Sequence, residues 1–147
     1  RVRERKHPKL YWVDPGLARA VKRQLGSVTV EERGALLEGW IFTLLRTYAE
    51  ERALYDEVFY WAPLQANRTE VDFILRRGQE VLALEVKPTR RFSPSLLKGL
   101  KAISDLDSVV RKILIYSGDR LLRTEEGIDV WPVARFLEAL ATNELWP

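Results

Sequence analysis

The sequence predicts one mixed α/β domain in which a single sheet is flanked by helices. Its 147 residues suit one hydrophobic core, and 46% hydrophobic with 31% charged residues is a globular composition. Some segments carry apolar residues at helical spacing, and others are short runs of residues that favour β-strands. From residue 30 onward these segments follow the order helix, three strands, helix, two strands, helix. That order predicts a mixed sheet with helices packed on it.

The N-terminal third predicts a short strand and two helices. Residues 10–13 (LYWV) are typical of a strand, and the first helix covers about residues 14–22. Thr29 and Glu32 form a capping box, which predicts the start of a longer helix. This helix is expected to end in the charged residues 50–52. The apolar stripe of this helix consists of Leu37, Trp40, Ile41, Leu44, Leu45 and Tyr48.

Three strands are predicted next, at residues 58–61, 70–75 and 80–87. The second and third are separated by residues 76–79 (RRGQ), a short turn that contains glycine. This spacing predicts an antiparallel hairpin.

The C-terminal part predicts two more helices and two more strands. Ser93 is expected to be the N-cap of a helix with Pro94 at its first position. Residues 113–116 form an apolar run typical of a buried strand, and residues 128–131 form another strand. Pro132 begins the terminal helix. We expect the tryptophans to pack in the core rather than to bind a ligand; they are Trp12, Trp40, Trp61, Trp131 and Trp146.

Absent residues exclude several classes of site. The chain has no cysteine, which excludes disulfides, zinc knuckles and thiol nucleophiles, and the lone His7 cannot build a histidine-rich metal site. Neither a phosphate-binding glycine loop nor a nucleophile elbow is found. No apolar run is long enough to span a bilayer and no signal peptide opens the chain, so we expect a cytoplasmic protein without membrane contact.

Positive charge is concentrated at the N-terminus. The formal net charge is +3, and residues 1–10 hold five basic groups and one acid. We predict that residues 1–9 form a basic arm, which either contacts phosphates or is a linker from a missing upstream domain. Residues 10–147 would form a single domain. The absence of methionine, even at position 1, also predicts that the chain is part of a longer protein.

Carboxylates and a lysine on the predicted hairpin form a candidate metal site. Side chains alternate along a strand, so Glu85 and Lys87 share one face, and Asp72 lies on the neighbouring strand. Two carboxylates suffice to hold Mg²⁺ or Mn²⁺, which would activate a water molecule, and Lys87 could assist. Glu38, on the flank of the long helix, could add a carboxylate. The alternative is a water-facing strand surface with a Glu–Lys pair.

The run Glu70-Val71-Asp72-Phe73 followed by Leu84-Glu85-Val86-Lys87 resembles motifs II and III of the PD-(D/E)xK nucleases. The preceding helix with Glu38 and the order α-β-β-β-α-β are similar to the restriction-endonuclease-like core of those enzymes. The resemblance implies a Mg²⁺-dependent endo- or exonuclease in which Asp72 and Glu85 hold the metal. The catalytic residues would then be Asp72, Glu85, Lys87 and Glu38.

The chain is also similar, over nearly its whole length, to C-terminal domains of unknown function that follow the ATPase module in prokaryotic AAA-type ATPases. The stretch Lys9–Leu17 (KLYWVDPGL), the helix start Gly34-Ala35-Leu36-Leu37-Glu38 and the turn Val130-Trp131-Pro132-Val133 carry this resemblance. It implies an upstream ATPase domain as a partner.

Two features keep other functions open. Val71 stands where the nuclease motif has proline, and the helix after the hairpin lacks an evident polar fourth motif. Alternatives are therefore an inactive module that binds nucleic acid or protein for an ATPase, and a dimerisation domain, which leaves a homo-oligomer open. Arg90, Arg91 and Lys98 follow the site and are predicted to bind nucleic acid, with a charged surface loop as the alternative.

Overall fold

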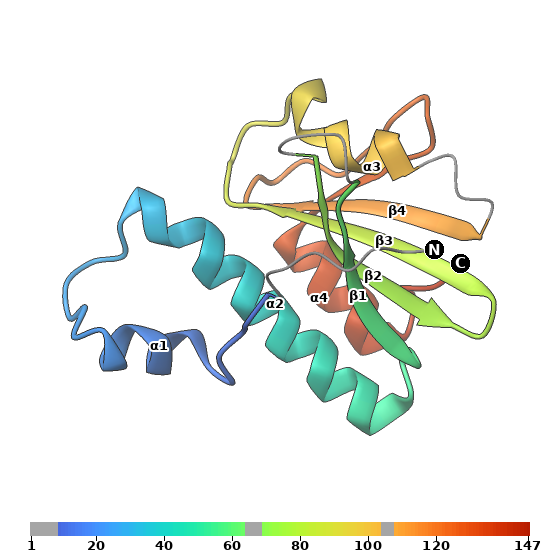
Figure 1. Cartoon of the computed structure of the whole chain (residues 1–147). Coiled ribbons are helices and arrows are strands. Elements are labelled where there is room, and N and C mark those ends of the chain that lie inside the picture. The colour runs from blue at the N-terminus through green and yellow to red at the C-terminus, as the bar shows by residue number, and fades with distance from the viewer. Residues whose placement is uncertain (1–8, 64–68, 104–107) are drawn as a thin grey trace.

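The computed structural model describes residues 9–63, 69–103 and 108–147 of the chain, and it confirms the mixed α/β fold. Six strands form one sheet in the order β1-β2-β3-β4-β6-β5 (Figure 1). The strands are β1 (Glu57–Trp61), β2 (Val71–Arg77), β3 (Glu80–Lys87), β4 (Val109–Tyr116), β5 (Leu122–Arg123) and β6 (Asp129–Pro132). The helices are α1 (Pro15–Val21), α2 (Val30–Arg52), the 3₁₀ helix η1 (Pro94–Leu97), α3 (Lys98–Ala102) and α4 (Val133–Thr142).

The predicted hairpin is confirmed. β2 and β3 pair antiparallel, and Gly78 occupies the turn with a φ of 60°, in the left-handed region that glycine adopts most readily. β3 pairs with β4 in parallel, and β4 pairs with β6 in parallel. The mixed sheet therefore places β3, which carries Glu85 and Lys87, between an antiparallel and a parallel neighbour. The edge strand β5 was not predicted, because two residues give no periodicity to recognise.

Helices cover both faces of the sheet (Figure 1). On one face, Ile41 of α2 and Phe136 of α4 share a core with Leu84 of β3. On the other face, Leu97 and Leu100 pack with Ala83 of β3. The water-facing strand surface considered as an alternative for Glu85 is therefore wrong, because η1 and α3 cover that face and leave Glu85 only 3% exposed.

The predicted strand at residues 10–13 is also wrong. This segment joins no sheet; it lies along α2, where the ring of Tyr11 stacks on Phe42 with centroids 4.5 Å apart. Thr43 Oγ1 donates a hydrogen bond to the carbonyl oxygen of Val13 at 3.0 Å. We call residues 9–13 the N-terminal strap. The rest of the predicted basic arm, residues 1–8, lies outside the described residues.

The predicted helix caps and tryptophan positions were confirmed only in part. The capping box of Thr29 and Glu32 begins α2 as predicted. Ser93 does not cap the next helix, since its hydroxyl contacts Ser95 Oγ instead of a backbone N–H group. The predicted core packing of Trp12 and Trp40 is wrong, as these side chains are 43% and 37% exposed. Within the described ranges, no helix has the length and apolar character needed to cross a bilayer.

We expect Gly99→Ala to destabilise the fold. A Cβ atom at this position of α3 would lie 2.1 Å from the carbonyl oxygen of Glu70, so helix and strand would have to separate. Overpacking of this kind costs about 1–3 kcal/mol of unfolding free energy, measurable by urea denaturation. Gly34→Ala in α2 is the matched control, because its Cβ would lie 3.8 Å from Pro88, and it should stabilise by up to about 1 kcal/mol. Equal effects of the two substitutions would contradict this packing.

Candidate functional site

Asp72 lies where the β2–β3 ladder ends. The last regular pair is Phe73 with Leu84. Beyond this pair, the backbone N–H of Val86 donates to Asp72 Oδ2 at 2.9 Å, so the side chain takes the place of a backbone acceptor. This contact holds a carboxylate that is only 4% exposed, and it leaves Oδ1 for another partner.

Glu85 lies on β3, on the face covered by η1 and α3. Lys87, two residues along the same face, forms an ion pair with Glu85 Oε1, as the strand alternation predicted. The other oxygen, Oε2, is buried and has no hydrogen-bond partner among the described residues. A buried oxygen of this kind requires an explanation, and a bound cation is one that is common in proteins.

Glu38 reaches the site from α2 through two residues of the N-terminal strap. Lys9 Nζ lies 2.9 Å from Glu38 Oε1 and 2.9 Å from Asp72 Oδ1, so the ammonium group bridges α2 and β2. The hydroxyl of Tyr11 donates to the same oxygen of Glu38. Glu38 is thus partly buried and paired, instead of facing water on the helix flank.

Burial and charge shift the proton affinities of these groups. Burial and the negative charge of Asp72 together raise the pKa of Glu85 to about 7, against the attraction of Lys87. Burial opposes the charge of Lys9, but its contacts with Asp72 and Glu38 outweigh that cost and raise the pKa of Lys9 above its usual range. Burial and the hydrogen bond to Glu38 raise the pKa of the Tyr11 hydroxyl.

The structure gathers the four predicted catalytic side chains in one region, although they are not arranged as a closed metal cage. No group of three histidine, cysteine or acidic residues is close enough to hold a metal ion within the part of the chain described here. Lys9 and Tyr11 were missed as site residues. Their positions two apart in an extended segment indicated a shared side, but partners 63 and 27 residues away cannot be read from local spacing.

The three predicted nucleic-acid-binding residues are all exposed and belong to two segments, the loop after β3 and the start of α3. Arg90 borders a groove of about 440 Å³ beside α2, together with Arg33 and Trp40. Arg91 is exposed in the loop after β3. Lys98 is exposed at the start of α3. This helix covers the face of the sheet that carries Glu85, whereas α2 and the groove lie on the other face.

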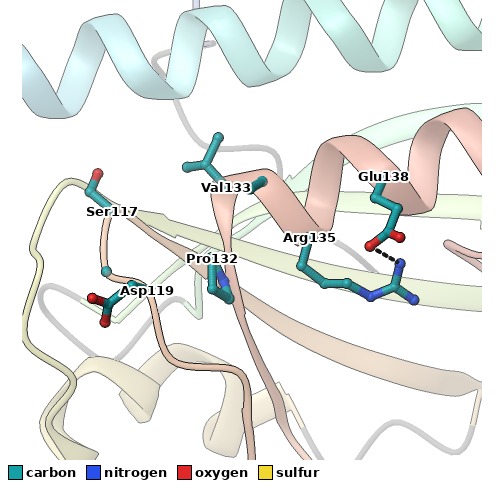
Figure 2. Close-up of a pocket in the computed structure, with 8 residues that line it drawn as sticks. Ser117, Asp119, Pro132, Val133, Arg135 and Glu138 are labelled. Atoms are coloured by element: carbon teal, nitrogen blue, oxygen red, sulfur yellow. Dashed lines mark hydrogen bonds and ion pairs between the residues drawn. The ribbon is translucent and has the colours of Figure 1, made fainter.

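A larger cavity, of about 690 Å³, lies at the end of β4 and the start of α4. Figure 2 shows Ser117 and Asp119 on one side of it and Pro132 and Arg135 on the other. The guanidinium of Arg135 is paired with Glu138 and with Glu144. None of the candidate carboxylates lines this cavity, so we do not assign the site to it.

Comparison with family models identifies the family of the chain. The model described as "Domain of unknown function (DUF4143)" matches residues 33–136, more than two thirds of the sequence. The chain belongs to this family. The matched part of the DUF4143 domain contains all three candidate carboxylates and Lys87, whereas Lys9 and Tyr11 precede it. Searches of curated proteins and of solved structures gave no significant match.

The raised pKa of Glu85 makes the stability of the DUF4143 domain depend on pH. Its pKa is about 7 in the folded state against 4.5 as the ordinary value, so between these pH values the folded state keeps a proton that the unfolded state has lost. The free energy of unfolding should therefore fall as the pH rises through this window. We expect the stability of the parent relative to Glu85→Gln to drop by about 2–3 kcal/mol between pH 5 and 8.

Urea denaturation at the two pH values measures this difference. Glu80→Gln is the matched control, because Glu80 lies on the same strand with an exposed side chain, and it should show little change with pH. A Glu85→Gln variant whose stability follows the parent across the window would contradict the shifted pKa.

Proposed function

We propose that this DUF4143 domain is a metal-dependent nuclease-fold domain, accessory to an ATPase, that hydrolyses or binds nucleic-acid phosphodiesters. The observation that carries the proposal is the buried pair of carboxylates, Asp72 and Glu85, with Glu85 Oε2 lacking a hydrogen-bond partner among the described residues. The element order α2-β1-β2-β3-α3-β4 supports it, because it agrees with the α-β-β-β-α-β order of the nucleases that the sequence resembles.

The donor set fits a hard divalent cation. Asp72 and Glu85 offer carboxylate oxygens, the ligands that Mg²⁺ and Mn²⁺ prefer, and two such groups suffice where water completes the coordination. A metal ion bound there would supply Lewis acidity and a water molecule of lowered pKa. The ionised form of Glu85, which burial disfavours, would be stabilised by the ion.

Each neighbouring residue has a part in this proposal. The N–H group of Val86 holds the Asp72 carboxylate in place through Oδ2. Lys87, paired with Glu85, could orient the attacking water or balance charge on the phosphate. Glu38 would act on the site through the cation that it shares with Asp72, which in this structure is the ammonium group of Lys9.

The groove beside α2 supplies a path for a nucleic-acid strand. It begins next to the site, since Pro88 directly follows Lys87 and lines the groove with Arg33, Arg90 and Trp40. Both arginines are exposed and have no ion pair with a described carboxylate. Guanidinium groups bind phosphates, and an exposed indole ring can stack on a base.

Calorimetric titration with Mn²⁺ tests the metal site. We expect the parent to bind, and the double variant Asp72→Ala, Glu85→Ala to lose binding, because both ligands are removed. The matched control is Glu57→Ala, Glu80→Ala, which removes two exposed carboxylates of β1 and β3. Glu85→Gln, which keeps the side-chain volume, serves if the double variant does not fold by circular dichroism.

Binding that depends on Asp72 and Glu85 should be accompanied by metal-dependent cleavage of plasmid or single-stranded DNA or RNA. Absence of Mn²⁺ binding at millimolar concentration and low salt, both in the parent and in the variant Lys9→Met, would overturn the metal-dependent proposal.

A second function is an inactive module that binds nucleic acid without metal. The pairing of Asp72 with Lys9 favours it, because Lys9 already supplies a positive charge to that carboxylate.

We expect the double variant Arg33→Ala, Arg90→Ala to bind DNA more weakly than the parent in the presence of a metal chelator. The negative slope of log affinity against log salt concentration should become shallower by about 2, since two phosphate contacts are lost. Arg46→Ala, Arg76→Ala, at two exposed ion pairs outside the groove, is the control. Equal slopes in the two double variants would exclude the groove as the binding surface.

A further inference from the structure

Lys9 places a positive charge on the oxygen through which Asp72 would bind a metal ion. Asp72 Oδ2 already accepts the Val86 N–H group, so Oδ1 is the oxygen with room for a cation. Lys9 Nζ lies 2.9 Å from that oxygen. The same nitrogen lies 2.9 Å from Glu38 Oε1, the arrangement of one cation shared by two carboxylates.

An ammonium group and a divalent ion compete for these two oxygens. Mg²⁺ binds carboxylate oxygens at about 2.0–2.1 Å, so it would lie against the same oxygens that Lys9 now contacts. Two cations within a few ångströms would also repel each other strongly in a partly buried site. Lys9 and a metal ion are therefore alternatives at this position.

The strap that carries Lys9 allows the ammonium group to leave. Lys9 is 23% exposed at its side chain, so water reaches it, and its four-carbon stem has several rotatable bonds. The ring of Tyr11 holds the strap against Phe42 and Phe73, whereas its neighbours Leu10 and Trp12 are 87% and 43% exposed. The Lys9 side chain can therefore turn outward while the core under α2 stays packed.

We infer that Lys9 is a tethered cation that competes with a divalent metal ion for Asp72 and Glu38, so that the metal binds only when Lys9 withdraws. This inference rests on the metal site proposed above. It makes the N-terminal strap a control element, because whatever pulls residues 9–13 from α2 also opens the site. Lys9 also balances part of the negative charge of Asp72 and Glu38.

Mn²⁺ titration of Lys9→Met tests the competition, because methionine keeps an unbranched stem and removes the charge. We expect Lys9→Met to bind Mn²⁺ at least about tenfold more tightly than the parent, since a unit charge next to the ion is removed. Lys9→Arg keeps the charge and should stay close to the parent. Lys22→Met, at an exposed lysine just after α1, is the control and should also match the parent.

Lysine acetylation of the unmodified protein, read by peptide mass spectrometry, supplies an independent measurement if Lys9→Met does not fold. Lys9 should react slowly without metal, since both carboxylates hold it in the charged form. Saturating Mn²⁺ should raise its labelling at least about threefold by releasing it, while labelling of Lys22 stays constant.

The outcomes separate the inference from the function on which it rests. Equal Mn²⁺ affinity of parent and Lys9→Met, or Lys9 labelling that does not respond to bound Mn²⁺, would overturn the competition and leave the metal site standing. Absence of binding in both proteins would overturn both. Tighter binding by Lys9→Met, or metal-dependent labelling of Lys9, supports the competition.

Discussion

The hydrogen bond from the Val86 N–H group to Asp72 Oδ2 is the contact on which the site depends. It lies at the end of the β2–β3 ladder, where the regular pairing stops after Phe73 and Leu84. A buried backbone N–H group requires an acceptor, and here the Asp72 side chain supplies it. The other oxygen of Asp72, Oδ1, is thereby directed toward Lys9 of the strap, which also contacts Glu38.

Charge balance then determines the rest of the site. Asp72 and Glu85 are almost fully buried, and burying a carboxylate is costly unless a positive charge or hydrogen bonds compensate for it. Lys87 compensates Glu85 in part and Lys9 is shared by Asp72 and Glu38. The compensation is incomplete at Glu85 Oε2, and the raised pKa of Glu85 has the same physical origin. A site of this kind is suited to a further cation or to a proton.

Strong local patterns explain which parts of the fold were predictable. The capping box of Thr29 and Glu32, the turn at Gly78 and the shared face of Glu85 and Lys87 on β3 each depend on residues close in sequence, and all three were confirmed. The strap was mistaken for a strand because residues 10–13 are of types that favour β-strands. In the structure this segment packs on α2 through Tyr11 and Phe42. Trp40 was placed in the core because its spacing puts it on the apolar stripe of α2, but it is 37% exposed and borders the groove.

By itself, the sequence determined the order of the longer elements from residue 30 onward, the hairpin and the shared face of Glu85 and Lys87, because these follow from backbone periodicity and short-range turns. The tertiary structure decided that this face is covered by α3, that Asp72 accepts a backbone hydrogen bond from β3, and that Lys9 is shared by carboxylates 29 and 63 residues away. The physical reason is that burial and charge pairing are properties of neighbours in space. Those neighbours come from α2, β2 and the strap, whose mutual positions exist only once the core has packed.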